Sequence, residues 1–230
     1  MIFLITGDRK GIGRHLSEYY LKKGNFVIGC SRSETDLVHD NYRHFQADVA
    51  NESDITKILK YIRKEHHQLD VLINNAGVAS MNHFLLTPLE TIKRVMEVNY
   101  IGTATMCNKM ARLMFKSKQP RIVNFTTVAR ALNLEGEAIY AASKSAVETL
   151  TKVLAKELSQ YGITVNAIGP TAIKTDLIKN VGEQKMQALL EKQSIKRFGT
   201  FEDVVNLIDF YIKPESHMIT GQVVYLGGVS

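Results

Sequence analysis

Cysteine and proline are scarce in this chain, which has two cysteines and four prolines among 230 residues. Cys30 and Cys107 stand far apart, without the CxxC or Cys/His spacing of a metal site. The sequence therefore predicts neither a disulfide framework nor a zinc site, and we expect two reduced, mostly buried thiols and no metal. A Pro/Gly/Ser-rich linker, a repeat and a low-complexity tract are also missing, so we expect one domain over residues 1–230.

Long apolar runs and runs of like charge are absent as well. No stretch approaches the roughly 18 apolar residues of a membrane span, and the apolar start is too short for a signal peptide. The net charge is +6, yet Lys and Arg are scattered among acidic residues. We therefore expect a cytoplasmic protein that binds neither membranes nor nucleic acid.

Short β-branched or apolar runs alternate with segments of helical periodicity. The expected strands are residues 2–6, 26–30, 44–47, 71–75, 122–126, 163–168 and 223–226. The expected helical segments are 11–24, 53–66, 91–117 and 143–162, the last ended by Gly162 in a C-cap position. This alternation indicates an α/β protein with a parallel sheet covered by helices on both faces.

The turn after the first expected strand is rich in glycine. It reads TGDRKGIG, with Gly7, Gly11 and Gly13 between a strand and a helix. Glycines there let the backbone approach a pyrophosphate, which the free N–H groups at the start of the helix can bind. The spacing is GxxxGxG rather than the commoner GxGxxG, and a plain glycine turn is the alternative interpretation.

Cations stand where such sheets bind the ribose of a dinucleotide. An Asp or Glu after the second strand is typical of NAD binding, but this chain has Ser31 and Arg32 there, and Lys10 in the glycine loop. Both cations could pair with a ribose 2′-phosphate, so we expect NADP(H) to be preferred over NAD(H). Two solvent-facing cations are the alternative.

Two Tyr/Lys pairs occur at a spacing of four residues, which places each pair on one face of a helix. Tyr19 and Lys23 fall in the helix after the glycine loop, where packing and solvation explain them. Tyr140 and Lys144 follow Thr127, a hydroxyl residue at the end of an expected strand. The spacing alone does not decide whether either pair is catalytic, because residues four apart share one face of any helix.

The motifs, taken together, resemble the classical short-chain dehydrogenase/reductase family. The matching stretches are TGDRKGIG, Asp48 with Val49, NNAG at 74–77, Asn99, Tyr140 with Lys144, and PTAIKT at 170–175. The resemblance covers nearly the whole chain and is nearest to the 3-oxoacyl-acyl-carrier-protein reductases. It implies one Rossmann-like domain of three layers with a seven-stranded parallel sheet.

The resemblance also implies roles for single residues. Tyr140 would be the proton donor, Lys144 would lower the pKa of that phenol and hold the nicotinamide ribose, and Asn99 would anchor a water. Asp48 would accept from the adenine amino group. The implied cofactor residues are Thr6, Gly7, Arg9, Lys10, Gly11, Ile12, Gly13, Ser31, Arg32, Asp48, Val49, Asn75, Ala76, Gly77, Tyr140, Lys144, Pro170, Thr171, Ile173 and Thr175.

Two residues depart from the family pattern. Thr127 stands where the family usually has Ser; its hydroxyl can donate to the substrate oxygen, while its methyl group restricts χ1 and crowds the site. Thr171 stands where the family generally has Gly, which bears on the local backbone path and not on the fold. We expect activity with a narrower or different range of substrates.

The resemblance implies a substrate wall at residues 129–138 and a lid at 176–199. The candidate substrate residues are Thr127, Ala129, Arg130, Glu137 and Tyr140. The wall is more polar than a steroid or a long acyl chain would favour. The lid carries an apolar stripe that is typical of core packing and can also cover a substrate. The stripe consists of Ile178, Val181, Met186, Leu189 and Leu190.

The sequence thus predicts an NADPH-dependent reductase of carbonyl groups, or an enzyme for the reverse reaction. Its substrate would be a 3-oxoacyl thioester on a carrier, or a small ketone, aldehyde or sugar. A non-catalytic NADP(H)-binding sensor or regulatory scaffold is the alternative, because a fold does not fix a function. Amphipathic helices at 88–116 and 140–161 match those through which the family forms dimers and tetramers, so we expect a homo-oligomer; packing on the sheet alone is the alternative.

Overall fold

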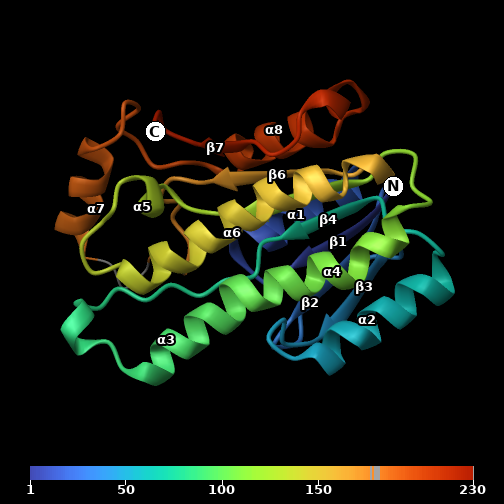
Figure 1. Cartoon of the computed structure of the whole chain (residues 1–230), viewed down its shortest axis with the longest axis horizontal. Coiled ribbons are helices and arrows are strands. Elements are labelled where there is room, and N and C mark those ends of the chain that lie inside the picture. Colours follow the sequence, from blue (N-terminus) through green and yellow to red (C-terminus); the bar gives the residue numbers. More distant parts are fainter. Residues whose placement is uncertain (177, 179–181, 230) are drawn as a thin grey trace.

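Parallel strands form one seven-stranded sheet in the order β3-β2-β1-β4-β5-β6-β7 (Figure 1). The structure is a computed structural model and describes residues 1–176, 178 and 182–229. The strands are β1 (Ile2–Thr6), β2 (Phe26–Ser31), β3 (Tyr42–Gln46), β4 (Val71–Asn74), β5 (Arg121–Phe125), β6 (Thr164–Gly169) and β7 (Val223–Tyr225). Every expected strand is present to within two residues at each end, which confirms the predicted parallel sheet.

Helices connect the strands along most of the chain. They are α1 (Gly11–Lys22), α2 (Glu52–Glu65), α3 (Leu89–Met96), α4 (Gly102–Met114), α5 (Val128–Ala131), α6 (Ala138–Glu157), α7 (Glu183–Glu191) and α8 (Phe201–Ile212). Short 3₁₀ turns lie at η1 (Phe84–Leu86), η3 (Ser159–Tyr161) and η4 (Pro214–Met218). Among the described residues, no helix is both long and apolar enough to cross a membrane.

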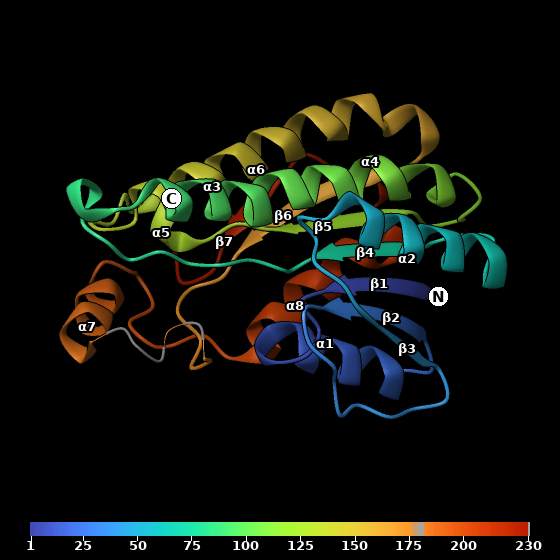
Figure 2. The same ribbon diagram turned by 90° about the horizontal axis from the view of Figure 1, so that it is seen from below.

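Two apolar clusters cover the two faces of the sheet. On one face, Ile58 of α2 and Met110 of α4 pack with Leu72 of β4. On the other face, Leu16 of α1 and Ile208 of α8 belong to the second cluster. Successive residues of each strand point to opposite faces, so strands buried on both sides must be apolar at nearly every position. The arrangement explains why the strands read as continuous apolar runs. Figure 2 shows β6, β5, β4, β1, β2 and β3 one after another across the sheet.

The expected helix over 91–117 is interrupted. A π-helical turn, η2 (Glu97–Ile101), joins α3 to α4 and contains Asn99. Gly102 is the first residue after this turn and packs closely against the chain that follows β3. A Cβ at Gly102 would come within 2.9 Å of Val49 Cγ2. A π turn shifts the register of the following residues by one position, and such turns often occur at functional sites. Helical periodicity on its own could not predict this insertion.

The end of the helix expected at 143–162 also differs. The helix α6 ends at Glu157, and the 3₁₀ turn η3 continues the chain to Tyr161. Gly162 ends that turn with a φ of 72°. The predicted glycine cap is therefore present, but it caps the 3₁₀ extension and not the α-helix itself.

Candidate functional site

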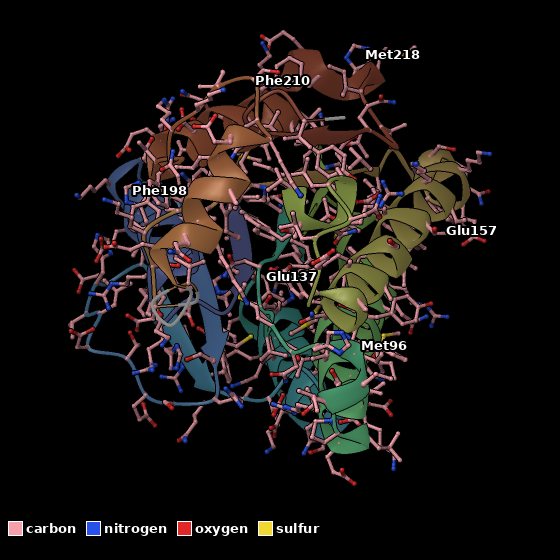
Figure 3. The ribbon with its side chains drawn as sticks, turned by 90° about the vertical axis from the view of Figure 1, so that its left-hand side faces the viewer. Met96, Glu137, Glu157, Phe198, Phe210 and Met218 are labelled. Carbon is pink, nitrogen blue, oxygen red and sulfur yellow. The ribbon has the colours of Figure 1, made fainter. Side chains whose placement is uncertain are left out.

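The candidate site lies at the carboxyl ends of the strands. The chain order reverses between β1 and β4, because β2 and β3 continue on one side and β5 to β7 on the other. In a doubly wound sheet, ligands bind in the crevice at this point. Figure 1 shows α5 and α7 beyond this end of the sheet, and Figure 3 looks directly onto it.

A first cavity of about 240 Å³ lies along the glycine loop. Gly7 has a φ of 72°, and a Cβ at Gly13 would come within 2.2 Å of the Gly7 oxygen. Only glycine allows this backbone path and this close approach, and the resulting cradle suits a pyrophosphate. The predicted cofactor residues that line the cavity are Gly7, Arg9, Lys10, Gly11, Ile12, Ser31, Arg32, Asp48, Val49, Asn75, Ala76, Gly77 and Thr175.

Thr6 and Gly13 do not line the cavity, and Thr6 supports the glycine loop through hydrogen bonds. The Thr6 hydroxyl accepts a hydrogen bond from the Ala76 N–H at 2.9 Å. The Asn75 side chain donates to the backbone oxygens of Thr6 at 2.9 Å and Gly7 at 3.2 Å. These bonds hold the chain after β4 beside the chain after β1, which fixes the width of the crevice.

Asp48 and Val49 lie at one end of the first cavity. Asp48 Oδ1 accepts from the Ala50 N–H at 3.0 Å, and Asp48 Oδ2 lies 2.9 Å from Arg94 Nη2. Arg94 also lines the cavity, so this end offers a carboxylate and a planar guanidinium to a flat polar ring. The sequence did not single out Arg94, because it lies on α3, 46 residues after its partner, and only the tertiary fold brings them together.

Both cations expected to bind a 2′-phosphate line the first cavity. Lys10 Nζ lies 2.9 Å from Asp176 Oδ2, in a pair whose side chains are both more than half exposed. Arg32 is exposed just after β2, and its backbone oxygen accepts from the Gln46 side chain at 3.1 Å. An exposed ion pair contributes little free energy, so an anionic ligand can compete with Asp176 for Lys10.

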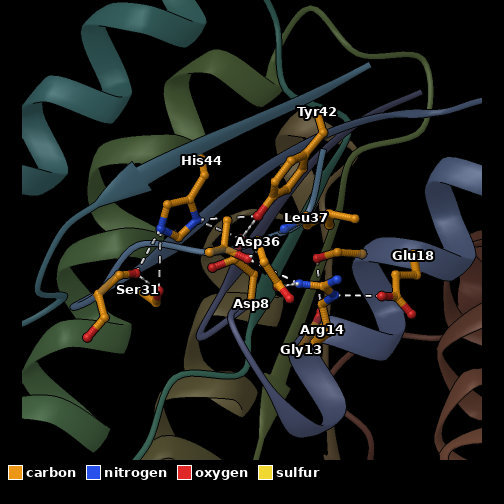
Figure 4. A network of polar contacts seen from close by, with 12 residues as sticks. Asp8, Gly13, Arg14, Glu18, Ser31, Asp36, Leu37, Tyr42 and His44 are labelled. Carbon is orange, nitrogen blue, oxygen red and sulfur yellow. Dashed lines mark hydrogen bonds and ion pairs between the residues drawn. The ribbon is translucent and has the colours of Figure 1, made fainter. Parts of the chain in front are cut away.

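A buried polar network lies beneath the end of β2 (Figure 4). Asp8 is fully buried; its Oδ2 accepts from the Tyr42 hydroxyl and lies 3.0 Å from His44 Nδ1. Burial lowers the pKa of His44, but the hydrogen bond and charge of Asp8 outweigh it and leave this pKa raised. His44 Nε2 lies 3.1 Å from the Ser33 oxygen, so the network fixes the loop after β2. The sequence analysis missed these residues, because they come from three separate segments.

Tyr140 and Lys144 lie on the first turns of α6, as their spacing predicted. Lys144 is buried, and its Nζ donates to the Phe125 oxygen at 2.8 Å and lies 6.0 Å from the centre of the Tyr140 ring. The Thr127 side chain lies close enough to the Tyr140 phenol to lower the pKa of that phenol. The structure therefore brings together the phenol, the ammonium and the hydroxyl that the sequence singled out.

Burial disfavours the charged forms of this pair. It raises the pKa of Tyr140 to about 12; the Glu137 carboxylate raises that pKa further, and the hydrogen bond from Thr127 opposes the rise. Burial also lowers the pKa of Lys144 to about 8. We expected Lys144, together with the positive charge of an oxidised nicotinamide, to lower the pKa of Tyr140; in the protein alone, burial is the largest influence on this pKa.

Asn99 is fully buried in the π turn and lines neither cavity. Its Oδ1 accepts from the Val78 N–H at 2.8 Å, and its Nδ2 donates to the Val78 oxygen at 2.9 Å and to Ser143 Oγ at 3.0 Å. A Cβ at Gly77 would lie 3.3 Å from Asn99 Oδ1 and 3.5 Å from Lys144 Nζ. Asn99 and Lys144 therefore both lie next to Gly77, which lines the two cavities.

A second cavity of about 590 Å³ adjoins the first. The two cavities share Ile12, Asn75, Gly77 and Thr175 in their walls. The predicted site residues along the second cavity are Ile12, Asn75, Gly77, Thr127, Ala129, Glu137, Tyr140, Lys144, Pro170, Thr171, Ile173 and Thr175. The reacting groups therefore line the second cavity, and Lys144 Nζ lies 3.5 Å from the position of a Cβ at Gly77, which borders both cavities.

Arg130 is placed outside both cavities, unlike the other predicted substrate residues. Its Nε lies 3.1 Å from Oε2 of the buried Glu148. Oε1 of Glu148 accepts from the hydroxyls of Thr126 at 2.6 Å and Tyr225 at 2.5 Å. This cluster ties α5, α6 and β7 together behind the cavity, and it gives Arg130 a structural partner that the sequence did not reveal.

The helix α7, in the segment expected to form a lid, lines one side of the second cavity. Ile178, Met186 and Leu189 belong to a small apolar cluster with residues that follow β5 and β6, and they also line the cavity. Leu190 is buried, whereas Val181 lies outside the described residues. The apolar stripe therefore packs against the body of the protein and faces the cavity as well.

Comparisons with known proteins agree with this geometry. A family model described as short chain dehydrogenase matches residues 1–186. The 3-oxoacyl-[acyl-carrier-protein] reductase of Vibrio cholerae is 31% identical over 233 residues, which cover 99% of this chain and 96% of that protein. The structure of the 3-ketoacyl-(acyl-carrier-protein) reductase of Brucella melitensis, complexed with NADH, is 25% identical with a TM-score of 0.91, over 99% of this chain and 96% of that one. The aldohexose dehydrogenase of Thermoplasma acidophilum is 26% identical with a TM-score of 0.89, over 99% and 92%.

Proposed function

Because the chain belongs to the short chain dehydrogenase family, as its motifs predicted, we propose that it is an NADPH-dependent oxidoreductase that reduces a carbonyl group to an alcohol, or catalyses the reverse reaction. The observation that carries the proposal is that Tyr140, Lys144 and Thr127 come together in the wall of the second cavity, which adjoins the first. A nicotinamide cofactor fits the first cavity, because its glycine loop forms a cradle that a Cβ would fill. When bound, the cofactor supplies or accepts a hydride.

The chain's own residues handle the proton of this reaction. In the reductive direction, the Tyr140 hydroxyl donates a proton to the oxygen that develops negative charge, and Thr127 donates a hydrogen bond to the same oxygen. Lys144 then favours the resulting phenolate with its charge and binds the ribose hydroxyls of the cofactor. The family pattern would also give Asn99 a water of the proton relay, although its side chain is bonded to Val78 and Ser143 and lines neither cavity. These roles follow the family pattern at the matching positions of this sequence.

The preference for NADP(H) over NAD(H) is part of the proposal. Arg32 and Lys10 line the first cavity, and each can pair with a ribose 2′-phosphate. The ends of the cavity support the rest of the cofactor: Asp48 and Val49 on the adenine side, and Thr175 on the nicotinamide side, where it borders both cavities.

For the substrate, we propose a 3-oxoacyl thioester on a carrier, or a small ketone, aldehyde or sugar. The relatives support both classes, since one acts on a carrier-bound 3-oxoacyl group by its name and another on aldohexoses. Ala129 and Glu137 would contact the substrate from the cavity wall. We also propose that the chain is one domain over 1–230, that it works in the cytoplasm, and that it assembles into homodimers or tetramers.

A non-catalytic NADP(H)-binding sensor is the competing proposal. One observation favours it: burial raises the pKa of Tyr140 to about 12, which opposes formation of the phenolate. The retained Tyr140 and Lys144 favour the enzyme, because a sensor has no need for a phenol and an ammonium in the wall of the second cavity.

The first experiment measures NADPH oxidation with acetoacetyl thioesters, diketones, aldehydes and keto sugars. We expect turnover with the wild type and a loss of at least about 100-fold in kcat for Tyr140→Phe, because general acid catalysis contributes that much. The variant should still bind NADPH, which an equilibrium binding measurement checks. Full activity of Tyr140→Phe would disprove the mechanism, and tight NADPH binding without turnover of any substrate by the wild type would favour the sensor.

A further inference from the structure

Glu137 is a buried carboxyl group in the wall of the second cavity. Only 7% of the residue is exposed, and its Oε2 is fully buried without a hydrogen-bond partner among the described residues. Figure 3 shows Glu137 near the centre of the face where the strands end. A buried polar group without a partner is costly, so a group with this cost at a ligand cavity calls for a functional explanation.

Glu137 occupies the N-cap position of α6 but does not cap the helix. A side chain at this position usually accepts from the first free N–H groups of the helix, and a carboxylate there is also favoured by the helix dipole. The Glu137 side chain makes no such bond and lines the cavity instead, three residues before Tyr140. The Glu137 carboxyl group is therefore available to accept a hydrogen bond from a ligand in the cavity.

The groups around the carboxyl restrict what that partner can be. Burial raises the pKa of Glu137 to about 7, and the charge of Lys185 on the lid helix opposes this rise. Lys192, at the end of the same helix, also lines the cavity. These two positive charges disfavour a second cation beside Glu137, whereas a neutral hydroxyl can donate to a carboxylate without the cost of burying a charge.

We propose that Glu137 binds a hydroxyl group of the substrate close to the reacting carbonyl, so that the enzyme selects hydroxylated ketones or aldehydes over unsubstituted alkyl ones. This inference rests on the proposed function, since it names the substrate class of the same site. A buried acceptor discriminates strongly, because a substrate that lacks the donor leaves the carboxylate desolvated and unpaired.

The test compares three ketones of nearly equal size: hydroxyacetone, aminoacetone and butanone. They share a methyl ketone and differ in the group that would meet Glu137. We expect wild-type kcat/KM with NADPH to be about 10- to 100-fold higher for hydroxyacetone than for butanone, since a hydrogen bond to a charged group contributes that much. Glu137→Leu should remove this preference mainly through KM, and Glu137→Gln should keep part of it, because the amide oxygen still accepts from a hydroxyl.

Two controls separate this role from others. Glu157→Gln removes an exposed carboxylate near the far end of the same helix and should leave the preference unchanged. Lys185→Met tests whether Glu137 serves only as an ion-pair partner of the lid. If Glu137→Leu and Lys185→Met both slow all three ketones by the same factor, the proposal is wrong.

Other results would also overturn the inference. If the wild type has equal kcat/KM for hydroxyacetone and butanone, the inference is wrong while the proposed function stands. A preference for aminoacetone would also overturn the inference. If the wild type turns over neither these ketones nor any substrate of the first panel, the proposed function fails. Saturation-transfer NMR on the NADPH complex then decides the inference alone: stronger binding of hydroxyacetone than butanone, lost in Glu137→Leu, supports it, and equal binding overturns it.

Discussion

At the scale of the residue, the site is built from ionisable groups that burial drives toward their neutral forms. The pKa is raised to about 12 at Tyr140 and to about 7 at Glu137, and it is lowered to about 8 at Lys144. The common cause is desolvation, which is the largest contribution at each position. A site of this kind costs stability, and sites with such perturbed groups are typical of catalysis.

Glu137→Gln is expected to change how stability depends on pH. The folded-state pKa of Glu137 is raised from 4.5 to about 7, so the folded protein holds this proton where the unfolded chain has lost it. The wild type therefore loses stability as pH rises from 4.5 to about 7, by up to about 3 kcal/mol, and loses no more above that. Urea unfolding from pH 4.5 to 8 should show this decline in the wild type and not in Glu137→Gln.

The difference between the two proteins is the decisive quantity, because other groups titrate equally in both. If the difference in free energy of unfolding between the wild type and Glu137→Gln stays constant from pH 4.5 to 8, the pKa of Glu137 is not raised in the folded protein. Glu157→Gln is the matched control, since its carboxylate is exposed and its removal should not alter the pH profile.

At the scale of the element, the sequence predicted the strands well, because buried strands need apolar residues on both faces. The glycine loop and the Tyr140/Lys144 pair were singled out through the resemblance of the whole set of motifs to a known family, because spacing alone does not distinguish this pair from Tyr19 and Lys23. The π turn around Asn99 and the ion pair between Asp48 and Arg94 were not predictable. Both depend on packing between elements that periodicity and local propensity do not describe.

Gly29 shows how tightly one strand and the buried network are matched. A Cβ at this position in β2 would meet Asp8 Oδ2 at 1.6 Å. Gly29→Ala should therefore displace the Asp8 carboxylate from Tyr42 and His44, with a loss of about 2–4 kcal/mol in the free energy of unfolding, because buried polar groups would lose their partners. Urea unfolding with a linear extrapolation measures the loss.

A second substitution checks the cause. Asp8→Ala removes the carboxylate that the new methyl group would meet, so the double variant with Gly29→Ala should lose much less than the sum of the two single losses. Gly182→Ala is the control, because nothing lies within 4 Å of a Cβ there and its φ is −59°. Additive losses at Gly29 and Asp8 would show that the clash is not what destabilises Gly29→Ala.

At the scale of the whole molecule, the first cavity joins two parts of the sheet. Its wall combines residues after β1 and β2 with residues after β4 and with Thr175 beyond β6. The hydrogen bonds of Asn75 to the oxygens of Thr6 and Gly7 cross the same boundary. A ligand that contacts both parts stabilises the folded chain as a whole, so cofactor preference can be measured as a difference in global stability.

NADPH is expected to raise the melting temperature of the protein by about 5–10 °C at 100 times its Kd, the shift that mass action predicts for a chain of this size. At the same concentration NADH should raise it far less, because it lacks the phosphate that Arg32 and Lys10 would bind. Arg32→Ser should reduce the difference between the NADPH and NADH shifts more than Lys10→Met does. The reason is that Lys10 already pairs with Asp176 and must give up this ion pair to bind the phosphate. Equal shifts with the two cofactors would mean that these cations face solvent, and the preference for NADPH would then have to be abandoned.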